Sequence, residues 1–213
     1  MSPGDHGEAD AVEIRTAHGP ARVHLRPVAE PRGLVMLGHG AGGGVAAPDL
    51  RTATEVFQEE GWSVALVEQP YRVAGRRAPA PARQLDGAWT DVALHLLAGP
   101  FAGLPLVVGG RSSGARVACR TAGTLRAVGV LCLAFPLQPP GRADRPSRLP
   151  ELESVEVPVL VVQGERDRFG MPPPALGRTV AVVPGDHSLK KDQPAIAEAI
   201  RTWLTGLATA PSS

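Results

Sequence analysis

The pattern of apolar and polar positions divides the chain into a short alternating part and a longer part built from continuous apolar runs. Near the N-terminus, AVEIRT (11–16) and ARVHLRP (21–27) alternate apolar with polar residues on either side of Gly19 and Pro20. Alternation of this kind is typical of strands with one buried face, and glycine next to proline marks a turn. The segment therefore predicts an antiparallel hairpin.

Continuous apolar runs follow the hairpin. They are GLVMLG (33–38), WSVALVE (62–68), LPLVVGG (104–110), AVGVLCLAF (127–135), VPVLVVQG (157–164) and RTVAVVPG (178–185). Such runs are typical of strands buried on both faces of a parallel sheet. Segments with helical spacing lie between or after them, at 49–60, 84–97, 113–122 and 194–207. The alternation predicts an α/β fold with a mostly parallel central sheet of about eight strands flanked by helices.

A chain of 213 residues suits one domain with a single core. We place this domain at residues 10–208 and expect flexible tails at 1–9 and 209–213. Two stretches rich in proline and arginine, 74–83 and 138–150, are predicted to be loops.

Composition narrows the class of protein. The net charge of +1 creates no field that would recruit nucleic acid or a membrane surface. No apolar run is long enough to span a membrane, and the N-terminus lacks the apolar core of a signal peptide. Cys119 and Cys132 lie inside apolar runs without metal-binding spacing, which predicts buried thiols in a reducing, cytoplasmic compartment. The excess of arginine over lysine, with abundant alanine, glycine and proline, is typical of a GC-rich bacterial genome.

The first candidate for chemistry is a serine between a predicted strand and a predicted helix. Gly110, Ser112 and Gly114 form the pattern G-x-S-x-G at this junction. In a nucleophile elbow of this kind, a sharp turn lifts the serine hydroxyl clear of the backbone, and small neighbours let strand and helix pack closely. The simpler interpretation is that Ser112 only caps the helix that follows it.

A serine hydroxyl is a poor nucleophile and needs a base. His187 follows the last apolar run on a predicted turn, and Asp167 follows the run before it. The order serine, aspartate, histidine is that of the α/β-hydrolases. Glu165 and Asp186 are rivals of Asp167, although Asp186 is adjacent to His187 and would have difficulty reaching its ring. His187 could instead be an ordinary surface residue of a turn.

The glycine-rich loop GHGAGGG (38–44) has two interpretations. Gly38, Gly40 and Gly43 match G-x-G-x-x-G, the dinucleotide-binding fingerprint. In that fingerprint the helix begins inside the glycines, whereas here 45–47 separate them from Pro48, a typical first residue of a helix.

The second interpretation is that the loop supplies a backbone N–H to the oxyanion of a tetrahedral intermediate. We assign this donor to Ala41, with Gly42 as the alternative, and expect the N–H of Ser113 to be the other donor. His39 is expected to order the loop through a hydrogen bond rather than to do chemistry.

The loop EQPYRVAGRRAPAPAR (68–83) follows a strand and should overhang the site. Arg72, Arg76 and Arg77 could hold an anionic group of the substrate by paired hydrogen bonds, and Tyr71 is a further candidate for substrate binding. Alternatively, these arginines pair with Glu68 or Asp86 and are otherwise solvated.

Five motifs together resemble the α/β-hydrolase superfamily. They are LGHGAGGG, VEQPYRVAGRRAPAPA, GGRSSGARVA, QGERDRFG and PGDHSLK, and the resemblance covers roughly residues 10–208. The chain is most similar to the small, lidless, dienelactone-hydrolase-like branch, which includes the KANSL/TEX-type hydrolase-like proteins. The resemblance implies Ser112 as nucleophile, His187 as base and Asp167 as the acid that orients it. Larger members insert a helical lid where this chain has only a short segment, 135–157, which implies an open site.

The sequence thus predicts a serine hydrolase that cleaves a small ester through an acyl-enzyme, with no metal or organic cofactor. Thioester, lactone or peptide hydrolysis uses the same acyl chemistry and stays open. The alternatives from other classes are a non-catalytic interaction module that kept the fold, and the dinucleotide-binding protein considered above. The sequence does not distinguish a monomer from a homodimer.

Overall fold

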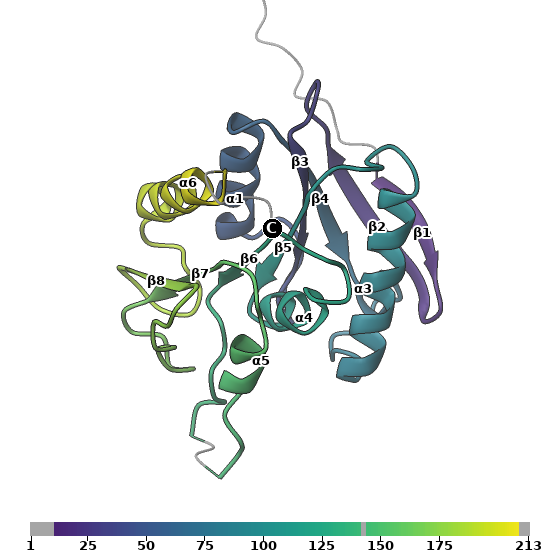
Figure 1. Ribbon diagram of the computed structural model, residues 1–213. Helices are drawn as coiled ribbons and strands as arrows, with labels where there is room; N and C mark the ends of the chain where they lie inside the picture. Colours follow the sequence, from purple (N-terminus) through teal and green to yellow (C-terminus); the bar gives the residue numbers. More distant parts are fainter. Residues whose placement is uncertain (1–10, 142–143, 209–213) are drawn as a thin grey trace, which may run out of the picture.

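A computed structural model describes residues 11–141 and 144–208 of the chain, so the tails predicted at 1–9 and 209–213 lie outside the described residues (Figure 1). In this part of the chain, no helix combines the length and the apolar character needed to cross a membrane.

The predicted hairpin is present, but its turn lies earlier than expected. Strands β1 (Ala11–Thr16) and β2 (Gly19–Arg26) pair in antiparallel fashion, and Pro20 lies within β2 opposite Arg15. The turn is closed by the Thr16 hydroxyl, which donates to the carbonyl of Gly19 (2.6 Å) and accepts from the N–H of His18 (3.1 Å). A short polar side chain at the strand end therefore sets the turn.

Within the described residues, eight strands form one sheet in the order β1-β2-β4-β3-β5-β6-β7-β8. The apolar runs become β3 (Gly33–Gly38), β4 (Trp62–Glu68), β5 (Leu106–Arg111), β6 (Gly129–Leu133), β7 (Val159–Gly164) and β8 (Arg178–Val183). Neighbours from β4 to β8 pair in parallel, whereas β2 pairs with β4 in antiparallel fashion. The fold class expected from the apolar pattern is confirmed.

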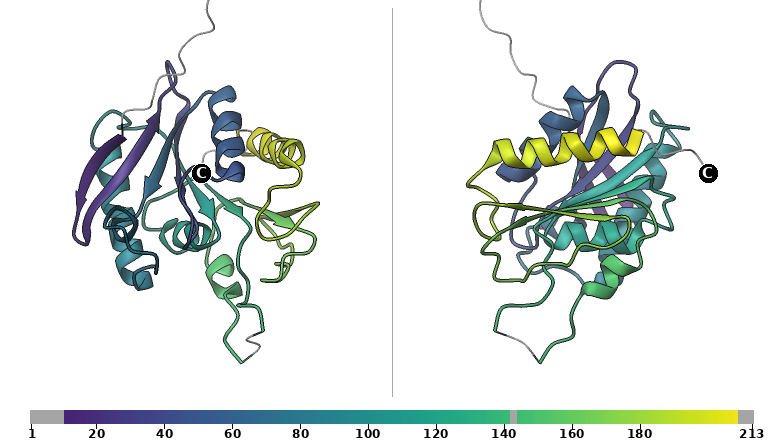
Figure 2. Two further views of the ribbon diagram at one scale, coloured as in Figure 1. Left: turned by 180° about the vertical axis from the view of Figure 1, so that it is seen from behind. Right: turned by 60° about the vertical axis from the view of Figure 1, so that its left-hand side comes forward.

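Helices cover both faces of the sheet (Figures 1 and 2). They are α1 (Pro48–Glu59), α2 (Pro70–Val73), α3 (Ala82–Leu97), α4 (Ser113–Thr121), α5 (Leu149–Glu153) and α6 (Gln193–Ala208). One face packs against α1 and α6, and the other against α3, α4 and α5. Alternate residues of β3 enter the two cores: Leu34 and Met36 on one face, Val35 and Leu37 on the other.

The strand order brings two loops together at the carboxyl edge of the sheet. The chain leaves β3 for β4 on one side, and β5 then takes the place next to β3 on the other side. Loops that follow such a pair diverge and leave a crevice, where open α/β sheets bind their ligands. The glycine-rich loop after β3 and Ser112 after β5 both lie at this point.

Candidate active site

Ser112 occupies a strained turn between β5 and α4. Its backbone has φ 52° and ψ −107°, a conformation that non-glycine residues rarely adopt and that costs free energy. A Cβ on Gly114 would collide with the backbone of Gly38, so β3 and α4 approach too closely for a residue larger than glycine. Ser112 is the N-cap residue of α4 by position, but its side chain makes no capping hydrogen bond. The simpler interpretation of Ser112 as a helix cap therefore does not describe its side chain.

His187 lies on the turn after β8, within hydrogen-bond distance of two groups. Its Nε2 is 3.0 Å from Ser112 Oγ, and its Nδ1 is 2.8 Å from Asp167 Oδ2. The ring of Phe169 packs against the imidazole with centroids 4.2 Å apart and planes tilted by 34°. The fold thus brings Ser112, His187 and Asp167 into one hydrogen-bonded chain, although they come from three separate loops.

Asp167 is held from several sides, and its carboxyl group is fully buried. The Phe169 N–H donates to Oδ1 (2.8 Å), and Gln163 Nε2 donates to Oδ2 (2.8 Å). Gln163 Nε2 also lies within 3.0 Å of the carbonyl oxygens of Phe135 and Gly170, so it ties three segments together. Sequence reasoning missed Gln163, because a glutamine at the end of a buried strand carries no motif.

The two rival carboxylates make other contacts. Glu165 is exposed and lies 3.4 Å from the Arg166 guanidinium. Asp186 accepts from the N–H (2.9 Å) and the hydroxyl (2.6 Å) of Ser188. The geometry favours Asp167 as the carboxylate that orients His187.

The glycine-rich loop is anchored by His39, as expected. The N–H of Gln69 donates to His39 Nε2 (3.1 Å), so Nδ1 carries the proton and donates to the carbonyl of Gly40 (2.8 Å). Burial lowers the pKa of His39 below its ordinary value of 6.5, which keeps the ring neutral and this pair of bonds intact. The Tyr71 hydroxyl donates to the carbonyl of Ala41 (3.0 Å) and adds a second anchor.

The candidate oxyanion donors have no partner of their own. In residues 11–141 and 144–208, the main-chain N–H groups of Ala41, Gly42 and Ser113 donate to no protein acceptor. Ser113 is the first residue of α4, where a free N–H and the positive end of the helix dipole both favour a negative ligand.

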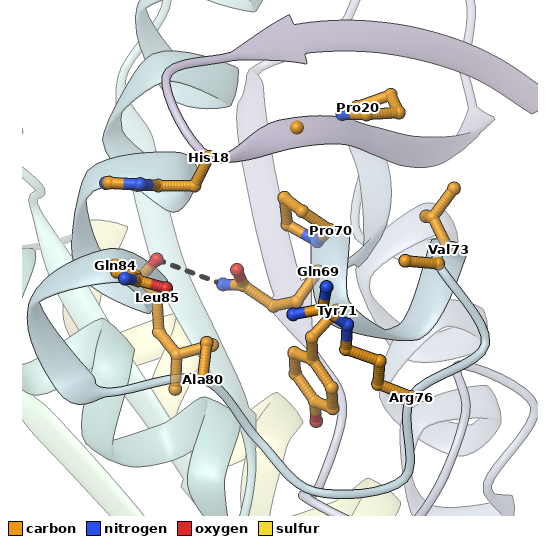
Figure 3. A pocket seen from close by; sticks show the side chains of 12 residues that line it. His18, Pro20, Gln69, Pro70, Tyr71, Val73, Arg76, Ala80, Gln84 and Leu85 are labelled. Atoms are coloured by element: carbon orange, nitrogen blue, oxygen red, sulfur yellow. Dashed lines mark hydrogen bonds between the residues drawn. The ribbon is translucent and has the colours of Figure 1, made fainter.

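Two of the expected substrate-binding residues, Tyr71 and Arg76, line a cavity of about 210 Å³ between the β1–β2 turn, α2 and the start of α3 (Figure 3). Figure 3 shows the Tyr71 ring pointing away from the hairpin, with its hydroxyl at the far end. Arg72 donates to the carbonyl of Arg76 (3.4 Å). The acids named as alternative partners are engaged elsewhere: Glu68 lies near Arg22 and His24, and Asp86 pairs with Arg120.

The remaining candidates for cofactor binding are metal-ligating side chains, the glycine-rich loop and the two cysteines. Among the described residues, no three histidine, cysteine or acidic side chains gather in a way that could hold a metal ion. The helix after the glycine-rich loop begins at Pro48, beyond the glycines, which is not the geometry of the dinucleotide fingerprint. Cys119 and Cys132 are buried free thiols, and their Sγ atoms share a hydrogen bond of 3.5 Å.

Comparison with known proteins assigns the class. The chain belongs to a family of the α/β-hydrolase domain, whose model matches residues 31–199. A search of curated proteins gives no match. The resemblance seen in the motifs is therefore confirmed for the α/β-hydrolases; its KANSL/TEX part stays a prediction.

Solved structures share the whole architecture at low sequence identity. A lidless α/β serine hydrolase from Xanthomonas campestris superposes with a TM-score of 0.76 at 19% identity, over 99% of this chain and 100% of that one. A dienelactone hydrolase from Anabaena variabilis gives 0.72 at 18% identity, over 93% and 97% of the two chains. Est1E from Butyrivibrio proteoclasticus with ferulic acid bound gives 0.75 at 14% identity, over 94% and 100%. At these identities the likeness establishes the fold.

Proposed function

We propose that the protein is a serine hydrolase that cleaves small esters through an acyl-enzyme. The observation that carries this proposal is the hydrogen-bonded chain from Ser112 Oγ through His187 to the buried Asp167, built on a strained elbow. A scaffold that only binds partners has no need to keep this strain or this chain. The interaction-module alternative therefore takes second place.

In this mechanism His187 Nε2 takes the proton of the Ser112 hydroxyl as its oxygen attacks the ester carbonyl. Asp167 holds Nδ1–H, so that the imidazole presents Nε2 to the serine, and stabilises the imidazolium that forms. His187 then gives the proton to the leaving alcohol. Water attacks the acyl-enzyme by the same steps and releases the acid.

The negative oxygen of each tetrahedral intermediate needs fixed donors. The free N–H groups of Ser113 and Ala41 are suited to this task, with Gly42 as the alternative in the loop. His39 and Tyr71 hold the carbonyl groups of Gly40 and Ala41, so the loop N–H groups are oriented before substrate arrives. Preorganised donors of this kind supply a large part of catalysis in acyl transfer.

A small substrate fits the architecture. The connection between β6 and β7 carries only the short helix α5 in its described part, so no helical lid covers the site. The structural neighbours include a dienelactone hydrolase and Est1E with ferulic acid bound, so lactones and aromatic esters remain candidate substrates. Thioesters follow the same chemistry.

Arg72 and Arg76 are proposed to favour an anionic ester, because the acids that could have neutralised them pair with other residues. Arg72→Ala should raise KM for an ester that carries a carboxylate and leave KM for a neutral ester of the same size unchanged. Steady-state kinetics with 4-nitrophenyl hydrogen succinate and 4-nitrophenyl valerate make this comparison. Equal effects on both esters would contradict the anionic preference.

The proposed function is tested by labelling with a fluorophosphonate probe, read by intact mass. We expect one label per wild-type chain and none on Ser112→Ala. A folded wild type that stays unlabelled would contradict the hydrolase proposal and move the interaction module to first place.

A further inference from the structure

Arg111, the residue before Ser112, makes contacts that the mechanism above does not use. Its Nε lies 2.9 Å from Asp49 Oδ2, and its Nη2 donates to the main-chain carbonyl of His187 (2.8 Å). A Cβ on Gly40 would lie 3.0 Å from Arg111 Nη1, so the guanidinium also packs directly against the glycine-rich loop. One side chain therefore touches the segments that carry the nucleophile, the base and a candidate oxyanion donor.

Asp49 makes this arrangement rigid. It lies in the first turn of α1, the helix that follows the glycine-rich loop, and its side chain is fully buried. Its Oδ1 accepts from the N–H of Leu50 (3.0 Å). Burial raises the pKa of Asp49, and the Arg111 guanidinium opposes this effect. A buried carboxylate is tolerated only with such a partner, so Arg111 is fixed in place by the cost of leaving Asp49 alone.

We propose that Arg111 is a positioning residue for the hydrolysis, an assignment that rests on the proposed function of Ser112. Arg111 fixes the main chain of His187 relative to the elbow and to the loop after β3. The hydrogen bonds of the His187 ring set the imidazole plane, whereas the bond from Arg111 sets the backbone from which the ring extends. The planar guanidinium forms an ion pair with Asp49 through Nε and donates a hydrogen bond to His187 through Nη2, whereas the ammonium of lysine is a single point charge without this fork.

The physical consequence is an effect on turnover rather than on substrate binding. Arg111 touches neither the reacting atoms nor the candidate substrate-binding residues, so its loss should leave KM nearly unchanged. A shift of His187 by a fraction of an ångström would weaken each proton transfer that His187 makes: from Ser112, to the leaving alcohol and from the attacking water. Misplacement of about 1 Å can cost about 100-fold in rate.

A test must separate positioning from stability. Arg111→Gln alone leaves Asp49 buried without a partner, which is costly enough to prevent folding. The double variant R111Q/D49N removes the ion pair and leaves no buried charge. Its comparison with D49N alone isolates the bond to His187, because D49N keeps Arg111.

We expect D49N and R111Q/D49N to unfold at similar temperatures. With 4-nitrophenyl acetate, the double variant should have a kcat about 10- to 100-fold below that of D49N. Its KM should stay within about twofold of the KM of D49N. The rate of inactivation by the fluorophosphonate should fall by a similar factor, and R111K/D49N should not restore it.

The control removes an ion pair away from the proposed site, in which Glu151 is partly exposed and also lies 3.2 Å from Arg120. Arg116 lies on α4, the helix that follows Ser112, and forms a two-pronged pair with Glu151 of α5 (2.7 and 2.6 Å). Its side chain is exposed to a similar extent as that of Arg111. R116Q/E151Q should keep the kcat of the wild type.

Two outcomes separate the two proposals. If kcat of the double variant equals that of D49N, or if the control loses as much, Arg111 has a structural role only and the assignment is overturned. If the wild type is neither labelled by the fluorophosphonate nor active, the hydrolase proposal itself fails.

Discussion

Asp167 differs from the other carboxylates near His187 in what surrounds it. It is buried, and three donors converge on its two oxygens: His187 Nδ1, Gln163 Nε2 and the N–H of Phe169. Glu165, two residues earlier, is exposed beside Arg166. In the proposed mechanism, a carboxylate held in this way selects the histidine tautomer that presents Nε2 to serine.

Asp167→Asn should therefore keep the fold and lower kcat by about a thousandfold or more, because an amide at this position favours the wrong tautomer. The matched substitution Glu165→Gln should change kcat by less than about twofold. Hydrolysis of 4-nitrophenyl acetate measures both. An equal loss in the two variants would remove Asp167 from its assigned role.

His39 makes a second prediction at this scale. Its pKa is lowered by burial, so below the ordinary value of 6.5 the unfolded chain binds a proton that the folded protein does not bind. The free energy of unfolding should thus be highest above this pH and decrease as the pH falls toward the lowered pKa.

Glutamine can donate to Gly40 and accept from Gln69 without titrating, so His39→Gln should remove this part of the pH dependence. Urea unfolding of both proteins at about pH 8 and about pH 5.5 gives the comparison. The same loss of stability in both proteins between these pH values would show that another group is responsible.

At the scale of elements, the elbow depends on close packing of β3, β5 and α4. Gly38, Gly110 and Gly114 meet there, and a side chain on Gly110 or Gly114 would overlap the backbone of Gly38. Backbone atoms of a central strand cannot move aside as a flexible side chain can. The glycines are therefore required by space, quite apart from the strain at Ser112.

Gly114→Ala should lower the free energy of unfolding by about 1–3 kcal/mol and displace Ser112. A Cβ on Gly123, just beyond α4, would have no neighbouring atom within 4 Å, so Gly123→Ala should stay within about 0.5 kcal/mol of the wild type. Urea denaturation measures both changes. A neutral Gly114→Ala would mean that the sheet adjusts more easily than its packing suggests.

The sequence predicted the elements that have a strong periodicity and missed those that do not. The apolar runs became strands and the four longer helical segments became α1, α3, α4 and α6. The helices α2 and α5 have four and five residues, too few for a periodic pattern, and both begin with or next to proline. The hairpin turn was misplaced because Thr16 closes it through its side chain, a contact that no spacing reveals.

The sequence predicted the residues of the candidate site that belong to motifs. It did not predict residues whose role depends on contacts with segments far away in the sequence. Ser112 and His187 follow strands that must end at the same edge of the sheet, so their approach could be expected. Arg111 fills a variable position of G-x-S-x-G, and Gln163 at the end of β7 belongs to no catalytic motif. Their roles depend on Asp49 and on carbonyl groups distant in sequence, which only the folded chain brings near.

At the scale of the whole molecule, the short connection between β6 and β7 bears on how the proposed hydrolase would meet its substrate. In a lipase with a lid, the serine is covered until an interface moves the lid aside. Here the His187 side chain is 21% exposed and Ser112 is partly exposed. In the described residues between β6 and β7, α5 is the only helix, so we expect substrate to reach the serine without the displacement of a lid.

Activity should therefore rise with ester concentration along one hyperbola and show no jump when the ester exceeds its solubility limit. Tributyrin, assayed from below to above that limit, makes the test, with Ser112→Ala to correct for background hydrolysis. Because we propose a small ester as substrate, kcat/KM should be higher for 4-nitrophenyl butyrate than for the palmitate. A sharp rise at the solubility limit would mean that some segment covers Ser112 in solution, and the connection between β6 and β7 would be the first place to look for it.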